Sequence, residues 1–230
     1  MSSPVRIALA GATGLVGRRV MEVAVGRPEL RLVAIGRSEA KLPAGARMEQ
    51  FVAAPSFWGE IMEAVRPHVF LCALGTTWKK SGQEETAFRA ADYDLVMESA
   101  RQAIESDVRR MVFVSSVGAH IGSKQLYLRV KGEVERDLAR MGFDRLDIMR
   151  PGLLRGERHE DSRPAERAGQ VLAPLADLML HGKYRIYRSV DARIIARAML
   201  ALALKSTRGR YIHEHDSILR AARDLPGLGG

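Results

Sequence analysis

Tyr127 and Lys131 stand four residues apart in a stretch whose apolar spacing predicts a helix. At that spacing the two side chains share one face of the helix. A free phenol titrates at roughly pH 10, and a neighbouring ammonium favours the phenolate and brings proton exchange closer to neutrality. The pair could therefore exchange a proton with a carbonyl or an alcohol. A Tyr-x-x-x-Lys pattern is common by chance, so its weight depends on the motifs around it.

A predicted strand ends in two serines, Ser115 and Ser116, shortly before this helix. A hydroxyl at that strand end could hold a substrate carbonyl and polarise it for hydride attack. The register of the strand favours Ser116 as the catalytic serine and leaves Ser115 as the alternative. The order of serine, tyrosine and lysine is what makes the pattern specific.

The chain opens with an apolar run, Val5–Ala10, that leads into three glycines spaced by three, Gly11, Gly14 and Gly17. A helical pattern follows at once. Strand, glycine turn and helix start together form an anion site, because backbone N–H groups and the helix dipole both favour negative charge there. Gly11 would permit the turn, Gly14 would let a diphosphate approach the backbone, and Gly17 would let helix and strand pack closely. The stretch predicts a dinucleotide site, although a glycine turn alone is often only a turn.

The second predicted strand ends in Gly36-Arg37-Ser38, about twenty residues beyond the glycine turn. An enzyme that prefers NAD usually carries Asp or Glu there, whereas an arginine can meet the 2′-phosphate of NADP. Arg37, with the hydroxyl of Ser38 beside it, therefore favours NADP, and NAD remains the alternative.

The loop after the fourth predicted strand begins Leu74-Gly75-Thr76. A small residue at this point lets a cofactor pass over the edge of the sheet. Trp78 could stack on a ring, and Lys79 or Lys80 could meet an anion. An ordinary solvated loop explains these three residues equally well.

Short apolar runs alternate with helical patterns along the chain, which predicts an α/β fold: a doubly wound parallel sheet with helices on both faces. The predicted strands are Val5–Ala10, Leu30–Gly36, Met48–Ala53, Val69–Leu74, Arg110–Ser115 and Leu146–Arg150. The predicted helices are Leu15–Val25, Phe57–Val65, Glu84–Ser106, Leu126–Met141 and Ala192–Lys205. Beyond residue 152 the alternation weakens, with further strands expected at Arg185–Ser189 and Arg210–His213 and a short final helix. We expect a single Rossmann-type domain, with a dinucleotide-binding core over 1–152 and a small cap, last strand and helix over 153–230.

Composition narrows the possible partners. The 230 residues are 47% hydrophobic, as in a globular protein with a large core. The net charge is +9, but basic residues are scattered among acids, which does not favour nucleic-acid binding. No apolar run approaches the roughly 20 residues of a membrane span, and no third ligand accompanies His213 and His215 for a metal. The single cysteine, Cys72, excludes an internal disulfide and indicates a cytoplasmic protein, which we expect to be a monomer or homodimer.

Taken in order, the motifs resemble an atypical short-chain dehydrogenase/reductase, of the HIV Tat-interactive protein-like NAD(P)-binding Rossmann family. The matching stretches are Gly11–Gly17, Ile35–Arg37, Leu74–Thr77, Ser115–Ser116, Tyr127–Glu135, Arg150–Leu154 and Ser162–Pro164. The resemblance implies that Tyr127 donates and accepts the proton with Lys131 beside it, and that Arg163 reaches the cofactor from the cap. The expected cofactor-binding residues are Gly11, Thr13, Gly14, Leu15, Val16, Gly17, Arg37, Ser38, Leu74, Gly75, Thr76, Ser115, Tyr127, Lys131, Pro151, Leu154 and Arg163. Two departures stand out: Ser38 is neutral and Trp78 is aromatic where the family commonly has basic residues.

Residues and resemblance together predict an NADP-dependent oxidoreductase acting on a small carbonyl or alcohol, with Ser116, Tyr127 and Lys131 as its catalytic residues. Two other functions stay open. A non-catalytic NADPH-binding regulator would use the same cofactor residues and offer its cap to a protein partner. A nucleotide-sugar epimerase or dehydratase would need a sugar-nucleotide lobe that is usually longer than the tail of this chain.

Overall fold

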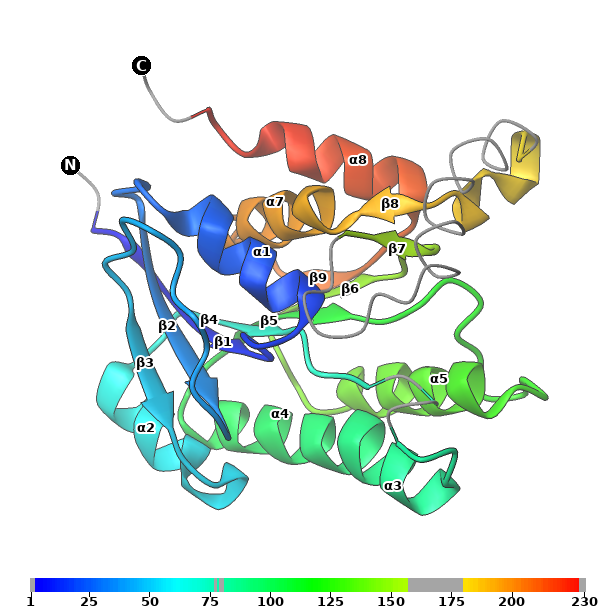
Figure 1. The fold of residues 1–230 in the computed structure, drawn as a ribbon, viewed down its shortest axis with the longest axis horizontal. Helices are drawn as coiled ribbons and strands as arrows, with labels where there is room; N and C mark the ends of the chain where they lie inside the picture. Colours follow the sequence, from blue (N-terminus) through cyan, green and yellow to red (C-terminus); the bar gives the residue numbers. More distant parts are fainter. Residues whose placement is uncertain (1–2, 77, 79–80, 157–179, 228–230) are drawn as a thin grey trace.

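The computed structural model describes residues 3–76, 78, 81–156 and 180–227. Its centre is a seven-stranded sheet in the order β3-β2-β1-β4-β5-β6-β9, in which every neighbouring pair is parallel (Figure 1). The strands are β1 (Val5–Ala10), β2 (Leu30–Gly36), β3 (Glu49–Val52), β4 (Val69–Cys72), β5 (Arg110–Val114), β6 (Arg145–Met149) and β9 (Gly209–His213). The α/β fold with a Rossmann-like parallel sheet is therefore confirmed.

Helices cover both faces of the sheet (Figure 1). One face carries α1 (Leu15–Ala24), α7 (Ala192–Ala203) and α8 (His215–Asp224); the other carries α2 (Trp58–Val65), α4 (Leu95–Glu105) and α5 (Leu126–Leu138). Alternate residues of a strand point to opposite faces, so Ile7 and Leu9 of β1 join the first apolar layer while Ala8 and Ala10 join the second. A strand covered on both sides is apolar along its whole buried length, which is why β4 and residues 111–114 of β5 are uniformly apolar.

The order of the strands reverses at β1, whose neighbours are β2 on one side and β4 on the other. The chain therefore runs outward from β1 to β2 and β3 and then crosses back to β4 on the other side of β1. In open parallel sheets this arrangement leaves a crevice beyond the carboxyl ends of the two central strands, where ligands bind. The segments that follow β1, β2, β4 and β5 all meet at this edge.

The structure corrects two expected elements. The helix expected over Glu84–Ser106 is instead α3 (Glu85–Arg89), a π turn η2 (Ala90–Asp94) and α4. The strand expected at Arg185–Ser189 is wrong: the chain forms a 3₁₀ helix η3 (Gly182–Tyr187). Only Val190 and Asp191, just beyond the expected strand, have a neighbouring strand to pair with, at Leu154–Arg155, and Tyr187 is about half exposed.

A small second sheet consists of two strands that lie far apart in the sequence. These are β7 (Leu154–Arg155) and β8 (Val190–Asp191), which pair in parallel. Asp191 then caps α7 by accepting a hydrogen bond from the backbone N–H of Arg193 at 2.7 Å. A further short element among the described residues is the 3₁₀ turn η1 (Pro55–Phe57). Within the described residues, no helix is both long and apolar enough to cross a bilayer.

Candidate functional site

The glycine turn between β1 and α1 has no room for side chains. Gly11 has φ +89°, and a Cβ added to it would lie 2.4 Å from the carbonyl oxygen of Ala73. A Cβ on Gly17 would lie 2.1 Å from the oxygen of Gly11. Gly14 precedes α1, and no side chain caps the first turn of that helix. The unpaired N–H groups of the first turn are therefore left for another acceptor.

A cavity of about 1080 Å³ begins at this turn and reaches α5. Thr13, Gly14, Leu15 and Val16 line one end; Ser115, Tyr127 and Lys131 line the other. Leu74, Gly75, Thr76, Trp78, Asp92, Val114 and Leu154 also line it. One continuous space thus joins the predicted anion site to the predicted proton-transfer pair.

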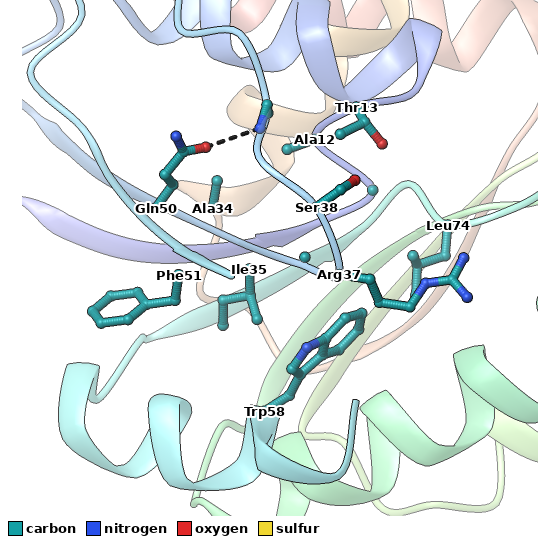
Figure 2. A pocket seen from close by; sticks show the side chains of 13 residues that line it. Ala12, Thr13, Ala34, Ile35, Arg37, Ser38, Gln50, Phe51, Trp58 and Leu74 are labelled. Atoms are coloured by element: carbon teal, nitrogen blue, oxygen red, sulfur yellow. Dashed lines mark hydrogen bonds between the residues drawn. The ribbon is translucent and has the colours of Figure 1, made fainter. Parts of the chain in front are cut away.

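A smaller pocket of about 90 Å³ lies beside it at the end of β2 (Figure 2). Arg37 and Ser38 stand on its rim, with Ser38 on the side of Thr13 and Arg37 on the side of Leu74. The indole of Trp58 is almost fully buried and donates from Nε1 to the carbonyl of Ala53 at 3.1 Å. No carboxylate occurs among the described residues that line this pocket. Glu39 lines the larger cavity beside it and accepts from Nε2 of Gln50 at 3.2 Å. Within its own described lining residues, the smaller pocket thus offers an anionic group the guanidinium of Arg37 and no carboxylate.

Lys131 is buried in an ion pair. Its Nζ lies 2.9 Å from Oδ1 of Asp92, and both side chains are at most 4% exposed. Burial lowers the pKa of Lys131, but the attraction of Asp92 and Tyr127 outweighs it, so the pKa stands above its ordinary value. The second carboxylate oxygen of Asp92 accepts from the backbone N–H of Thr76 at 2.6 Å. The lysine is thus held charged at the wall of the cavity.

Tyr127 takes part in an aromatic cluster on the same wall. Its ring centroid lies 5.9 Å from that of Phe88, which is fully buried. Phe88 meets the ring of Trp78 edge to face, again with centroids 5.9 Å apart. Trp78 therefore contacts a protein ring and is only partly exposed to the cavity.

Ser115 and Ser116 differ sharply in their surroundings. The hydroxyl of Ser115 donates to Oε1 of Glu135, and Nε of Arg150 lies 3.0 and 3.1 Å from the two oxygens of that carboxylate. An ionised carboxylate can only accept hydrogen bonds, so the single proton of Ser115 is committed. Ser116 is half-buried and donates only a long bond of 3.3 Å, to the carbonyl of Val117. Its hydroxyl can be redirected at little cost.

Relatives of this chain cover most of its length. Protein fmp52, mitochondrial, from Aspergillus fumigatus is 35% identical over 210 residues, 88% of each chain. Protein FMP52, mitochondrial, from Candida albicans is 32% identical over 205 residues, which is 86% of this chain and 88% of the relative. The model of the HIM1 family matches residues 60–184. The chain belongs to the HIM1 family.

Solved structures share the fold of this HIM1-family chain at low sequence identity. UDP-glucose 4-epimerase from Brucella ovis in complex with NAD superposes with a TM-score of 0.70 and 14% identity, over 91% of this chain and 76% of the epimerase. The UDP-glucose 4-epimerase of Thermus thermophilus, also in complex with NAD, gives 0.67 and 18% identity, over 96% and 83%. The chain thus has the same fold as these NAD-bound epimerases.

The expected cytoplasmic location is wrong for this family. The relatives in Aspergillus fumigatus and Candida albicans are named mitochondrial. A single cysteine excludes an internal disulfide in any compartment, so Cys72 could not distinguish one reducing compartment from another.

The structure brings most of the expected residues of this HIM1-family chain to the two pockets. Those that line them are Gly11, Thr13, Gly14, Leu15, Val16, Arg37, Ser38, Leu74, Gly75, Thr76, Ser115, Tyr127, Lys131 and Leu154. Gly17, Ser116 and Pro151 are not among the lining residues; the carbonyl of Pro151 instead accepts from the backbone N–H of Val117 at 2.9 Å. Lys79, Lys80 and Arg163 fall outside the described residues.

Two buried acids near the cavity, Asp92 and Glu135, were not among the residues predicted from the sequence. Asp92 lies four residues after Phe88 and four before Val96, both fully buried. Glu135 follows buried Lys131 by the same spacing. An acid that interrupts the apolar face of a helix must find a partner when it is buried. A single acid within an otherwise apolar helix face was therefore the sequence feature that could have identified both residues.

Proposed function

We propose that this HIM1-family protein binds NADP, with NAD as the alternative, and acts as an oxidoreductase of the atypical, HIV Tat-interactive protein-like type on a small carbonyl or alcohol. The observation that carries the proposal is that the uncapped start of α1 and the pair Tyr127 and Lys131 line one cavity. Residues 1–152 would form the dinucleotide-binding core, and 153–230 the cap, last strand and last helix.

The residues present fit a dinucleotide. The first turn of α1 offers free N–H groups to a diphosphate, and Gly14 has no side chain to obstruct it. Arg37 and Ser38 would meet a 2′-phosphate in the pocket of Figure 2. The bound nicotinamide would supply or accept the hydride.

The protein's own part of the reaction is proton transfer. Tyr127 would give its phenolic proton to the oxygen of a carbonyl that is being reduced, or take one from an alcohol that is being oxidised. The ammonium of Lys131, kept charged by Asp92, would stabilise the phenolate left behind. A hydroxyl at the end of β5 would donate to the same substrate oxygen.

Ser116 is our candidate for that last role, because the proton of Ser115 is committed to Glu135. Ser115 lines the cavity and Ser116 does not, so the hydroxyl of Ser116 would have to turn toward the substrate. We expect Ser116→Ala to reduce turnover by about tenfold to a hundredfold, the scale of one hydrogen bond to a developing charge. Ser115→Ala should instead lower the free energy of unfolding by about 1 kcal/mol. Steady-state rates and urea unfolding of both variants test this; the reverse assignment would make Ser115 the catalytic serine.

The preference for NADP depends on Arg37. The two tryptophans, Trp58 and Trp78, line the two pockets, so energy transfer from tryptophan to the reduced nicotinamide reports binding. We expect NADPH to bind at least about tenfold more tightly than NADH, and Arg37→Ala to remove the difference. Arg31→Ala is the matched control, because Arg31 lies on β2, the strand that ends just before Arg37, but pairs with Glu49 at 2.6 Å. Equal affinities for the two nucleotides in the unaltered protein would contradict the role of Arg37.

An epimerase is the second candidate, since the solved structures with this fold include UDP-glucose 4-epimerases bound to NAD. Those chains are longer than this one, which spans 76% and 83% of them. Incubation with UDP-glucose and NAD, followed by separation of the sugars, distinguishes the candidates: conversion to the epimer would favour this one.

A further inference from the structure

Asp92 lies in the π turn η2, which interrupts the α-helical hydrogen-bond pattern between α3 and α4. The π turn Ala90–Asp94 separates α3 from α4. Such a turn inserts one extra residue into the helix and often occurs at functional sites. Here the middle residue of the turn is an acid with no exposed surface, and it lines the large cavity.

Both carboxylate oxygens of Asp92 face hydrogen-bond donors. Oδ1 lies 2.9 Å from the ammonium of Lys131 on α5, and Oδ2 accepts from the N–H of Thr76 in the loop after β4. A Cβ added to Gly75 would lie 3.2 Å from Oδ1 and 3.4 Å from Nζ of Lys131. The acid therefore joins two segments of the cavity wall. An asparagine could accept from only one of the two donors, because its amide nitrogen donates.

Among the described residues, few groups other than Asp92 lie near enough to balance the positive charge of Lys131. Nζ lies 5.1 Å from the ring centroid of Phe113. The titratable groups near it are Asp92 on the π turn, Tyr127 on its own helix and Cys72 on β4. Burial raises the pKa of the Cys72 thiol to about 12, so that thiol stays neutral. Asp92 is thus the carboxylate that offsets the burial of this ammonium.

We propose that Asp92 is the positioning residue of this site: its carboxylate keeps the Lys131 ammonium charged and in place, and fastens the Gly75–Thr76 backbone against it. Asp92 acts through Lys131 and Thr76. The effect on the cofactor rests on the proposed function, whereas the effect on the charge of Lys131 does not.

Four proteins test the proposal: the unaltered chain, Asp92→Asn, Lys131→Met and the double variant. Their unfolding by urea is followed between pH 7 and pH 9.5. Breaking a buried ion pair by removing one partner is far more harmful than removing both. At pH 7 we therefore expect Asp92→Asn to fold with an equilibrium constant lower by about a hundredfold to a few thousandfold, and the double variant to recover part of that loss.

The pH dependence separates charge from packing. In the unaltered chain the pKa of Lys131 lies above its ordinary 10.5. The contribution of Lys131 to the free energy of unfolding is therefore constant below about pH 10.5 and is lost only above it. Without the carboxylate, burial lowers the pKa of Lys131 below the unfolded value. The unfolded chain then binds more protons, and stability rises with pH. The difference in free energy of unfolding between Asp92→Asn and the double variant should therefore become smaller toward pH 9.5. The same comparison made in the Tyr127→Phe background excludes any contribution of the phenol to the pH dependence.

A difference between these two variants that stays constant with pH would overturn the proposal, and so would an Asp92→Asn protein as stable as the unaltered one. If Asp92→Asn does not fold at pH 7 but the double variant does, the proposal is supported; if neither folds, while Lys131→Met does, it is overturned. NADPH titration adds the functional readout, where Asp92→Asn should bind about tenfold more weakly and unchanged affinity would remove the positioning role. Failure of the unaltered chain to bind NADPH would defeat the proposed function alone, since the unfolding result decides the charge of Lys131 separately.

Discussion

Tyr127→Phe should reduce turnover by about a hundredfold to ten-thousandfold, the usual contribution of a general acid or base, and leave NADPH affinity within a few-fold. Phenylalanine keeps the ring that packs on Phe88, where the centroids are 5.9 Å apart. The variant therefore removes the proton and little of the packing. Initial rates and energy-transfer titration of the same preparation measure both quantities.

Tyr211→Phe is the control for this change. The hydroxyl of Tyr211 donates to the carbonyl of Arg208 at the β9 edge of the sheet, at 2.9 Å, and Tyr211 does not line the cavity. It should therefore leave turnover unchanged. Full turnover by Tyr127→Phe would exclude Tyr127 from proton transfer.

Gly11→Ala should abolish nucleotide binding and lower the free energy of unfolding by about 3 kcal/mol or more. The added methyl meets the carbonyl of Ala73 at 2.4 Å, and backbone at that distance must shift. Residues forced into the left-handed region cost about 1–3 kcal/mol, and crowding a packed region costs a similar amount. Urea unfolding and NADPH titration test both effects.

Gly142→Ala isolates the backbone part of that loss. Gly142 has the same φ of +89°, but a Cβ added there meets nothing within 4 Å. We expect a loss of about 1–2 kcal/mol and unaltered NADPH binding. Equal losses in the two variants would show that the close approach of Gly11 to Ala73 contributes nothing.

The sheet could be predicted from sequence because its strands carry strong local signals. Apolar runs bounded by glycine, proline and polar residues placed β1 and β2 at their observed limits and the other strands within two residues. The weak points were segments whose structure depends on distant partners. Arg185–Ser189 contains Ile186 and Tyr187, residue types that strands favour, yet only Val190–Asp191 pairs with Leu154–Arg155. Local pattern does not show whether a strand has a neighbour.

The site divides in the same way. Gly11, Gly14, Tyr127 and Lys131 could be chosen because their spacing has a direct physical meaning within one turn or one helix. The partner of Lys131 could not be predicted in this way, because Asp92 is 39 positions earlier in the sequence. Asp92 reaches the cavity wall from a π turn, and residue spacing does not predict π turns. The choice between Ser115 and Ser116 likewise depends on Glu135 and Arg150, which only the folded chain brings together.

A crystal structure of the protein with NADPH tests the central claim most directly. We expect the diphosphate at the first turn of α1 beside Gly14, the 2′-phosphate beside Arg37, and the nicotinamide ring facing Tyr127 and Lys131. A diphosphate bound elsewhere, or a nicotinamide ring turned away from Tyr127, would contradict it.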